Sequence, residues 1–194
     1  MKFLIIGSGS IANRHYRNLK KIGYKNISFV TNKEKYLISK LRVFKSLPDA
    51  IKEFKPDIAL ICNSTHLHLK AAKICAFHGV HLFVEKPAIH RTKQYKNLVK
   101  IINKTKIINM VGFMMRFHPA IKIIEKFMKK QTYQPYYFYS EWGEYLPNWQ
   151  PSRNYKNSYA SNLKTGGGVT LTLCHDLDLM YFFFNNLKKC YNIK

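Results

Sequence analysis

The sequence predicts an α/β fold in which residues 1–111 form a doubly wound parallel sheet and residues 112–194 form an incomplete α+β domain. Short apolar segments of strand length alternate with amphipathic segments of helical length as far as Val111. A glycine-rich turn joins the first apolar segment to the first helical one. The alternation stops at Gly112, where a second part with a different pattern begins. Alternating strands and helices are typical of a parallel sheet covered on both faces.

The glycine-rich turn is the first candidate binding element. Residues 1–6 are an apolar run, and residues 13–22 carry apolar side chains at helical spacing. Between them lies Gly7-Ser8-Gly9-Ser10-Ile11-Ala12, which is typical of the opening strand, turn and helix of a Rossmann dinucleotide-binding unit. The first glycine permits the tight turn, the second lets a pyrophosphate approach, and Ala12 allows close helix packing. Taken alone, the motif fits a bound dinucleotide and a plain α/β turn about equally.

The remaining elements follow from the same alternation. The most continuously apolar segment is residues 58–62, which predicts a central parallel strand. Further strands are expected at residues 27–30, 42–44, 80–84 and 107–111, and helices at residues 49–54 (capped by Asp49), 67–78 and 92–103. The second part predicts a helix at 120–130, an aromatic strand at 136–142, a polar loop at 146–165 and a helix at 169–184.

The end of the second strand bears on the choice of cofactor. NAD-binding folds commonly place an acidic residue there to bind the ribose hydroxyls. This chain has Thr31-Asn32-Lys33 instead, and Glu34 lies beyond the expected point. A cationic end without a carboxylate accommodates a 2′-phosphate, which favours NADP, and either NAD or NADP remains open.

Polar side chains follow two other strands. Asn63 and Thr65 come directly after residues 58–62, at the strand end where ligands bind in open α/β sheets. Capping of the next helix by Ser64 or Thr65 is the alternative role. Lys86 follows the fifth strand and precedes Pro87, so it is expected to face the same crevice. An ordinary surface lysine is the alternative.

Composition limits the classes of function. Apolar residues make up 46% of the chain, enough for a real core, and no run approaches the about 18 residues of a membrane span. The four cysteines lack metal-ligand spacing, so we expect no metal, and the absence of a leader pattern predicts a cytoplasmic protein. Lys and Arg number 33 against 10 Asp and Glu, a net charge of +23. The basic residues are spread along the chain without a zinc or RNA-binding motif, so we expect no specific nucleic acid and no membrane partner.

Three motifs in order resemble the Gfo/Idh/MocA family of nicotinamide-dependent sugar oxidoreductases. They are the glycine turn at 7–12, Glu85-Lys86-Pro87, and Gly166-Gly167-Gly168 followed by His175. Gly112-Phe113 with Arg116-Phe117-His118-Pro119 is similar to the family's crossover into its second domain. The stretch 145–159 resembles a subgroup that acts in surface-sugar or nucleotide-sugar pathways.

The resemblance implies roles for individual residues. Lys86 matches the lysine that binds and polarises the substrate hydroxyl. His175 matches a helix histidine that serves as acid/base, and imidazole chemistry suits that task near neutral pH. Thr172 stands where the family often has Asp and cannot supply a carboxylate. A buried structural histidine is the alternative for His175.

The other site residues are expected to bind the nicotinamide dinucleotide. They are Gly7, Ser8, Gly9, Ser10, Ile11, Ala12, Thr31, Asn32, Asn63, Thr65, His68, Glu85, Lys86 and Arg116.

The length of the chain bears on whether it can carry the full activity of the family. Members of the family usually run well past 300 residues, with a largely antiparallel second-domain sheet that also forms the subunit interface. This chain has 194 residues, so we expect a shortened second domain, from a truncated or degraded gene or half of a split enzyme. A homo-oligomer is implied only where that sheet is complete. The expected function is hydride transfer to or from a sugar or nucleotide sugar. An inactive remnant or a nucleotide-binding module is the alternative.

Overall fold

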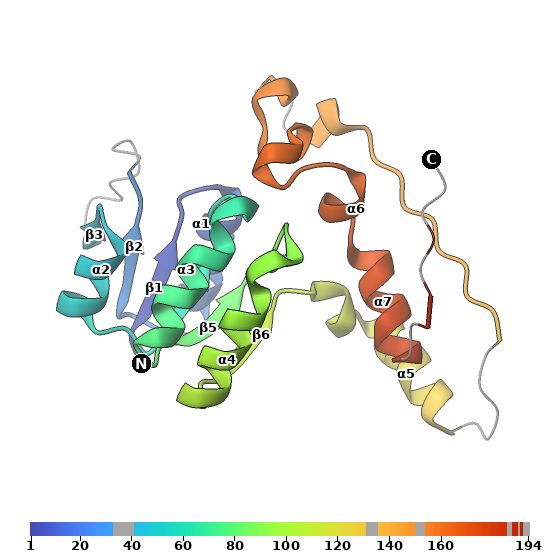
Figure 1. The fold of residues 1–194 in the computed structure, drawn as a ribbon, viewed down its shortest axis with the longest axis horizontal. Helices are drawn as coiled ribbons and strands as arrows, with labels where there is room; N and C mark the ends of the chain where they lie inside the picture. Colours follow the sequence, from blue (N-terminus) through green and yellow to red (C-terminus); the bar gives the residue numbers. More distant parts are fainter. Residues whose placement is uncertain (33–40, 131–135, 150–153, 186–187, 190, 192–194) are drawn as a thin grey trace.

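A six-stranded parallel sheet forms the first part of the protein (Figure 1). A computed structural model describes residues 1–32, 41–130, 136–149, 154–185, 188–189 and 191. The strands are β1 (Phe3–Ile6), β2 (Ile27–Val30), β3 (Val43–Phe44), β4 (Ile58–Ile61), β5 (His81–Val84) and β6 (Asn109–Val111). They run in the order β3-β2-β1-β4-β5-β6, and all neighbours pair in parallel. The predicted doubly wound sheet and its six strands are therefore confirmed, with small differences at strand ends.

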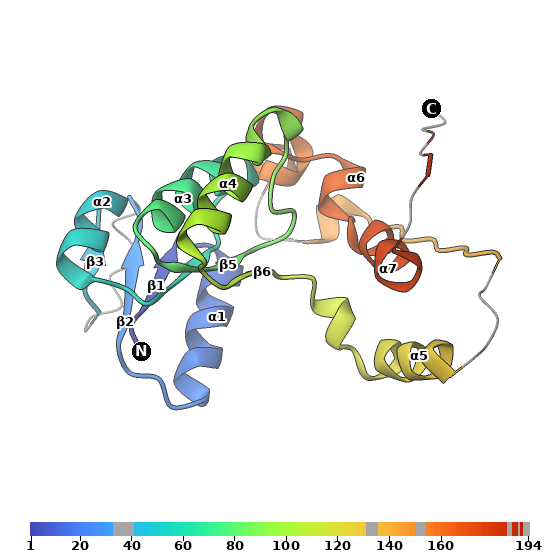
Figure 2. The ribbon, with the colours of Figure 1, turned by 60° about the horizontal axis from the view of Figure 1, so that its bottom comes forward.

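Helices cover both faces of this sheet (Figure 2). They are α1 (Ser10–Lys21), α2 (Leu47–Asp49), α3 (Thr65–Phe77) and α4 (Tyr95–Thr105), with the π-helix η2 (Ala50–Phe54) and the 3₁₀ turn η3 (Thr92–Gln94). Ala12 and Leu19 of α1 pack against Ile5 and Leu60 on one face. Because β1 is covered on both sides, all four of its residues are buried, as expected of a central parallel strand.

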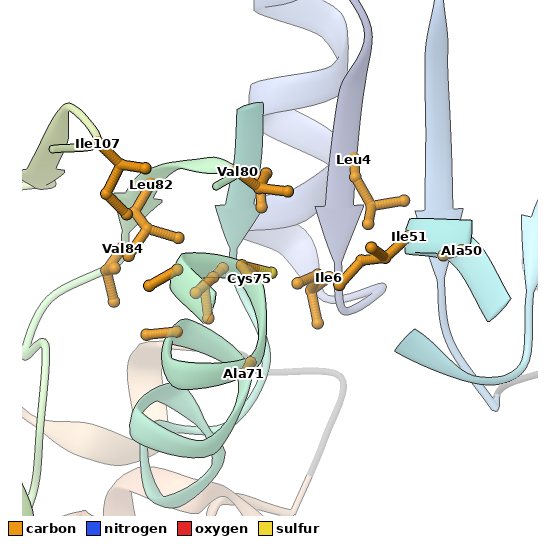
Figure 3. Close-up of a cluster of buried hydrophobic side chains, with 14 of the residues drawn as sticks. Leu4, Ile6, Ala50, Ile51, Ala71, Cys75, Val80, Leu82, Val84 and Ile107 are labelled. Carbon is orange, nitrogen blue, oxygen red and sulfur yellow. The ribbon is translucent and has the colours of Figure 1, made fainter. Parts of the chain in front are cut away.

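The larger core lies on the opposite face, under α3 and α4 (Figure 3). Ile6 of β1 lies beside Cys75 of α3, Leu4 lies on the side of Ile51, and Val84 of β5 belongs to the same cluster. Small side chains on α3 let the helix lie close to the sheet, and Ala71, Ala72 and Ala76 are almost fully buried.

One predicted helix start was wrong. Asp49 does not cap the segment that runs to Phe54. Ser46 is the N-cap of α2, and its hydroxyl accepts a hydrogen bond from the Asp49 backbone N–H at 3.2 Å. Serine is a strong N-cap residue and Pro48 suits the first turn that follows, so the helix starts earlier.

The described residues of the second part form helices, short 3₁₀ turns and an extended segment. Its elements are η4 (Met114–Phe117), α5 (Pro119–Lys130), η5 (Leu146–Trp149), η6 (Tyr155–Asn157), η7 (Tyr159–Ser161), η8 (Leu163–Thr165), α6 (Val169–Thr172) and α7 (His175–Phe184). The predicted helix at 120–130 is confirmed as α5. The strand predicted at 136–142 was wrong, because residues 136–145 are extended without pairing within the described chain. An aromatic run needs a partner strand to form a sheet.

The predicted helix at 169–184 is broken into α6 and α7. Leu173 and Cys174 leave regular helical geometry between the two. The carbonyl of Thr172, just before the break, accepts a hydrogen bond from Lys86 Nζ at 2.7 Å. In a continuous helix, the Thr172 carbonyl would accept a backbone N–H from the next turn. Here it accepts the side chain of Lys86 from the first part instead. None of the described helices has the length and hydropathy that crossing a membrane requires.

The buried sheet predicts a large contrast between two isoleucines. Ile5 is fully buried in β1, whereas Ile22 at the end of α1 is 71% exposed. Ile5→Ala should lower the free energy of unfolding by about 2–5 kcal/mol, because it leaves a cavity in the core. Ile22→Ala should change it by about 0.5 kcal/mol or less. Urea unfolding followed by circular dichroism measures both, and equal losses would contradict the core assignment.

Candidate active site

Gly7 fixes the turn that follows β1. Its φ is +113°, and its N–H donates to the Val30 carbonyl at 2.9 Å. A Cβ at this position would lie 2.8 Å from both the Cys62 carbonyl oxygen and the Asn63 nitrogen. Both the dihedral angle and the close approach exclude any other residue. The turn is therefore held against the end of β4.

Gly9 leaves the N-terminus of α1 accessible. It is the N-cap residue, and a Cβ built on it would meet nothing within 4 Å. The backbone N–H groups of the first turn have no intrahelical acceptors, and the positive end of the helix dipole lies there. Ser10 is exposed on this turn, while Ala12 is fully buried against the sheet. These features fit the pyrophosphate of a dinucleotide.

The end of β2 lies beside the same turn. The Thr31 hydroxyl donates to Ser8 Oγ at 2.8 Å, and Ser8 is itself buried. Asn32 follows and is exposed. Lys33 and Glu34, on which the expected preference between NAD and NADP depends, lie outside the described residues. The predicted neighbourhood of Thr31 and the glycine turn is present in the structure.

Three predicted cofactor residues come from the end of β4 and the start of α3. Asn63 Oδ1 is buried, and no hydrogen-bond partner for it occurs in the described part of the chain. Thr65 is the first residue of α3 and is buried. His68 is fully enclosed, with its ring nitrogens 2.9 Å from the Pro87 and Asn63 carbonyl oxygens. His68 therefore holds the two loops together, and Asn63 carries the free acceptor.

Lys86 crosses from the sheet to the second part of the chain. It follows β5 and is half-buried, and its ammonium group donates to the Thr172 carbonyl at 2.7 Å. The Thr172 hydroxyl cannot replace a carboxylate, and it donates to the Gly168 carbonyl at 2.6 Å. A backbone carbonyl at residue 172 thus contacts the lysine at the position where the resemblance implied an acidic side chain.

His175 begins α7, three residues after Thr172, and is 3% exposed. The Trp142 ring stacks on its imidazole with centroids 5.4 Å apart, and Phe113 packs edge-on at 6.4 Å. Burial and then the nearby Lys86 charge hold the pKa of His175 below its ordinary value of 6.5, against smaller opposing effects of Asp178, Asp176 and Glu85. Among the described residues, Nδ1 has no hydrogen-bond partner. The imidazole is therefore neutral near pH 7 and can accept a proton.

The glycine triplet brings the second part against the sheet. A Cβ on Gly166 would lie 2.8 Å from Thr65 Cβ and 3.1 Å from His90 Cβ. A Cβ on Gly167 would lie 2.4 Å from the Tyr159 and Ala160 carbonyl oxygens. The loop before α6 can pack this closely only because these residues lack side chains.

Two charged residues in the predicted cofactor set are paired within the protein. Arg116 binds the buried Asp178 carboxylate through Nε at 2.9 Å and a terminal nitrogen at 2.5 Å. Glu85 Oε1 lies 2.6 Å from His15 Nε2. Glu85 directly follows β5 and Arg116 lies in η4, and the charge of each is paired with a side chain of the protein.

Sequence reasoning assigned no role to Asp178, His15 or Trp142, and it missed the role of the Thr172 backbone. Asp178 and His15 are the partners just described, Trp142 covers His175, and the Thr172 carbonyl binds Lys86. The helical spacing of Ile11 and His15 placed His15 on the inward side of α1, which is the one signal that could have found it. The others depend on contacts between distant segments. Within the described residues, no group of three or more His, Cys, Asp or Glu side chains suits a metal ion.

The parallel sheet and the glycine turn at its edge are those of an NAD-binding Rossmann domain. Residues 1–113 match the family model described as an oxidoreductase family with an NAD-binding Rossmann fold. The chain belongs to this family, Gfo/Idh/MocA. The nicotinamide cofactor expected from the glycine turn is confirmed at the level of the family's domain.

Several known proteins are similar to the chain. The 4-carboxy-2-hydroxymuconate-6-semialdehyde dehydrogenase of a Sphingobium strain is 24% identical over 152 residues, covering 71% of this chain and 48% of that protein. The WlbA dehydrogenase from Bordetella pertussis, solved with NADH and UDP-GlcNAcA, has a TM-score of 0.77 at 20% identity, covering 95% of this chain and 59% of its own. D-galactose-1-dehydrogenase from Rhizobium etli has a TM-score of 0.73 at 17% identity, covering 94% and 57%. The chain spans about half the length of these relatives.

The two glycines of the turn should respond differently to alanine. Gly7→Ala should lower the free energy of unfolding by several kcal/mol, because of its positive φ and the contact with residues 62 and 63. Gly9→Ala should cost about 1 kcal/mol or less but weaken NADH binding at least tenfold, because the methyl group would occupy the path of the pyrophosphate. Thermal unfolding and fluorescence titration with NADH measure the two effects. Unchanged NADH affinity in Gly9→Ala would place the dinucleotide elsewhere.

Proposed function

We propose that the protein transfers hydride between a nicotinamide cofactor and a hydroxyl or keto carbon of a sugar or nucleotide sugar, in surface-polysaccharide or amino-sugar biosynthesis. The observation that carries the proposal is the contact of Lys86 Nζ with the Thr172 carbonyl, which brings Lys86 beside the helix that His175 begins. A cation that can bind a hydroxyl and a neutral imidazole then lie at the carboxyl edge of a nucleotide-binding sheet.

Each group has one task in the proposed reaction. The bound dinucleotide supplies the hydride acceptor for oxidation, or the hydride donor for reduction. Lys86 donates a hydrogen bond to the substrate oxygen and favours its developing negative charge. A ring nitrogen of His175 takes the hydroxyl proton as the carbinol C–H bond breaks and the carbonyl forms. In reduction, the same nitrogen returns the proton.

The substrate class rests on the chemistry of the site and on the relatives. A carbinol that binds between an ammonium group and an imidazole is common to many sugars. Solved structures of similar fold include a complex with NADH and UDP-GlcNAcA and a galactose dehydrogenase.

The residues proposed to bind the dinucleotide directly are those of the glycine turn, with Thr31, Asn32, Asn63 and Thr65. We also propose the division into domains 1–111 and 112–194, and a reducing, cytoplasmic location that suits the buried free thiols of Cys62, Cys75 and Cys174.

The alternative is a nucleotide-binding protein without catalysis. One observation favours it: η4 and α5 leave large apolar side chains in solvent. Phe117 is 61% exposed, Ile123 69% and Phe127 56%. An apolar face of this kind normally packs against another element. If the second part is loosely held, Lys86 and His175 would not keep a reactive geometry although the first part still binds the dinucleotide.

Substitution of the two reacting groups distinguishes these functions. In a panel of sugars and nucleotide sugars with NAD or NADP, His175→Asn and Lys86→Ala should each lower kcat about 100- to 10,000-fold while NADH still binds. His78→Asn and Lys100→Ala, at exposed positions of the first part, should retain full turnover. Full turnover in His175→Asn would remove the proposed proton transfer. A wild-type protein that binds NADH and oxidises nothing would support the non-catalytic alternative.

The charge of Lys86 should have a measurable effect on the pKa of His175. Because burial and that charge both lower the pKa of His175, the imidazole should bind its proton below pH 6.5, and oxidation should slow only as the pH falls through that lowered value. Removing the cation in Lys86→Gln should raise the pKa of His175 toward its ordinary value. NMR titration of the imidazole resonances, assigned with His175→Asn, measures the shift. Lys100→Gln should leave it unchanged, and a fall in Lys86→Gln would contradict the arrangement.

A further inference from the structure

His15 and Glu85 form a pair between α1 and the end of β5. Nε2 of His15 lies 2.6 Å from Glu85 Oε1. The His15 side chain is 18% exposed and the Glu85 side chain 14%, so solvent screens the contact only partly. His15 has no role in the proposed dinucleotide binding at the glycine turn, and it has none in the proposed proton transfer.

Glu85 is fixed at two further atoms. Its backbone N–H donates to the Ile61 carbonyl at 3.0 Å, which continues the pairing of β5 with β4. Its second carboxylate oxygen accepts the Lys86 backbone N–H at 3.3 Å. The carboxylate therefore joins His15 on one side to the main chain of Lys86 on the other.

The space around the pair is closed by its neighbours. The Phe83 ring packs edge-on against His15, with centroids 5.0 Å apart. A Cβ on Gly112 would lie 3.1 Å from the Phe83 ring and 3.4 Å from Glu85 Oε1. Rearrangement of the carboxylate would need movement of these groups. The direction in which Lys86 leaves the sheet is consequently set by a packed arrangement and not by a free loop.

We infer that His15 and Glu85 are positioning residues for Lys86. Through them, α1, whose N-terminus carries the glycine turn, also sets the place of the Lys86 ammonium group. The inference rests on the proposed function of Lys86 and changes the expected role of Glu85 from cofactor ligand to internal partner. Loss of the histidine donor would release the Glu85 carboxylate, loosen the Lys86 main chain and weaken the contact of Nζ with the Thr172 carbonyl.

The acylation rate of Lys86 reports how well its ammonium group is held in place, and the measurement does not require turnover. The whole protein is treated with a trace of an acetylating N-hydroxysuccinimide ester, and the rate at each lysine is followed by mass spectrometry. Lys86, half-buried and bonded to Thr172, should react more slowly than the exposed Lys100. His15→Phe keeps the ring that packs on Phe83 but removes the donor. It should raise the Lys86 rate about threefold to tenfold, as expected for the loss of one net hydrogen bond, with the Lys100 rate unchanged.

Conservative variants complete the test. His15→Gln places an amide N–H near the position of Nε2 and should return the Lys86 rate close to that of the wild type. Glu85→Met, which keeps most of the side-chain length but has no carboxylate to accept the Lys86 N–H, should raise the rate and gives the same readout if His15→Phe does not fold. An unchanged Lys86 rate in folded His15→Phe or Glu85→Met overturns the inference.

Kinetics separate this inference from the proposed function. If the wild type is active, His15→Phe should lower kcat about tenfold while the KM for the nicotinamide cofactor stays within about twofold, since a misplaced group costs rate more than binding. A fall in NADH affinity with unchanged kcat would instead make His15 part of the nucleotide site and overturn the positioning role. If the wild type shows no turnover but Lys86 is acylated faster in His15→Phe than in the wild type, the proposed function alone is refuted and the positioning role stands.

Discussion

The parallel pairing of β1 with β2 and β4 is the constraint on which the remaining structure depends. Ile6 pairs with Val30 on one side and with Ile61 on the other, so the three strands end in register. The loops that follow therefore begin at one edge of the sheet, which is where ligands bind in this topology. Residues far apart in sequence meet there because the strands run in one direction, and helices on both faces keep them from shifting.

The sheet was predictable because each strand is short, apolar and bounded by turn residues. A strand such as Ile58–Ile61 is covered on both faces and needs no information from elsewhere to be recognised. The aromatic segment at 136–142 has a similar local pattern, but a strand also needs a neighbour, and no local pattern reports that neighbour. The break before α7 lies beside the contact between Lys86 and Thr172, and helical periodicity in the sequence carries no information about a contact between such distant residues.

The site was predictable by position more than by role. Strand ends and the glycine turn indicated Gly7, Asn63 and Lys86 from the sequence, and the structure brings them to the same edge. Whether a charge at that edge faces a ligand or a protein partner is a different question. Arg116 is bonded to Asp178 and Glu85 to His15, and neither partner lies near in sequence. Burying these charges without partners would cost several kcal/mol, which is why the protein supplies them.

The packing between the two parts is unusually sensitive to a side chain at position 166, where the protein has glycine. The residue contacts no proposed reactant, yet its missing side chain is what lets the loop before α6 lie on Thr65 and His90. Any added carbon there would act as a spacer, moving α6 and α7 outward together. The distance between the lysine on the sheet and the histidine on the helix is thus adjustable from a third position, and natural or designed variation at that glycine could tune the reaction without altering either reacting group.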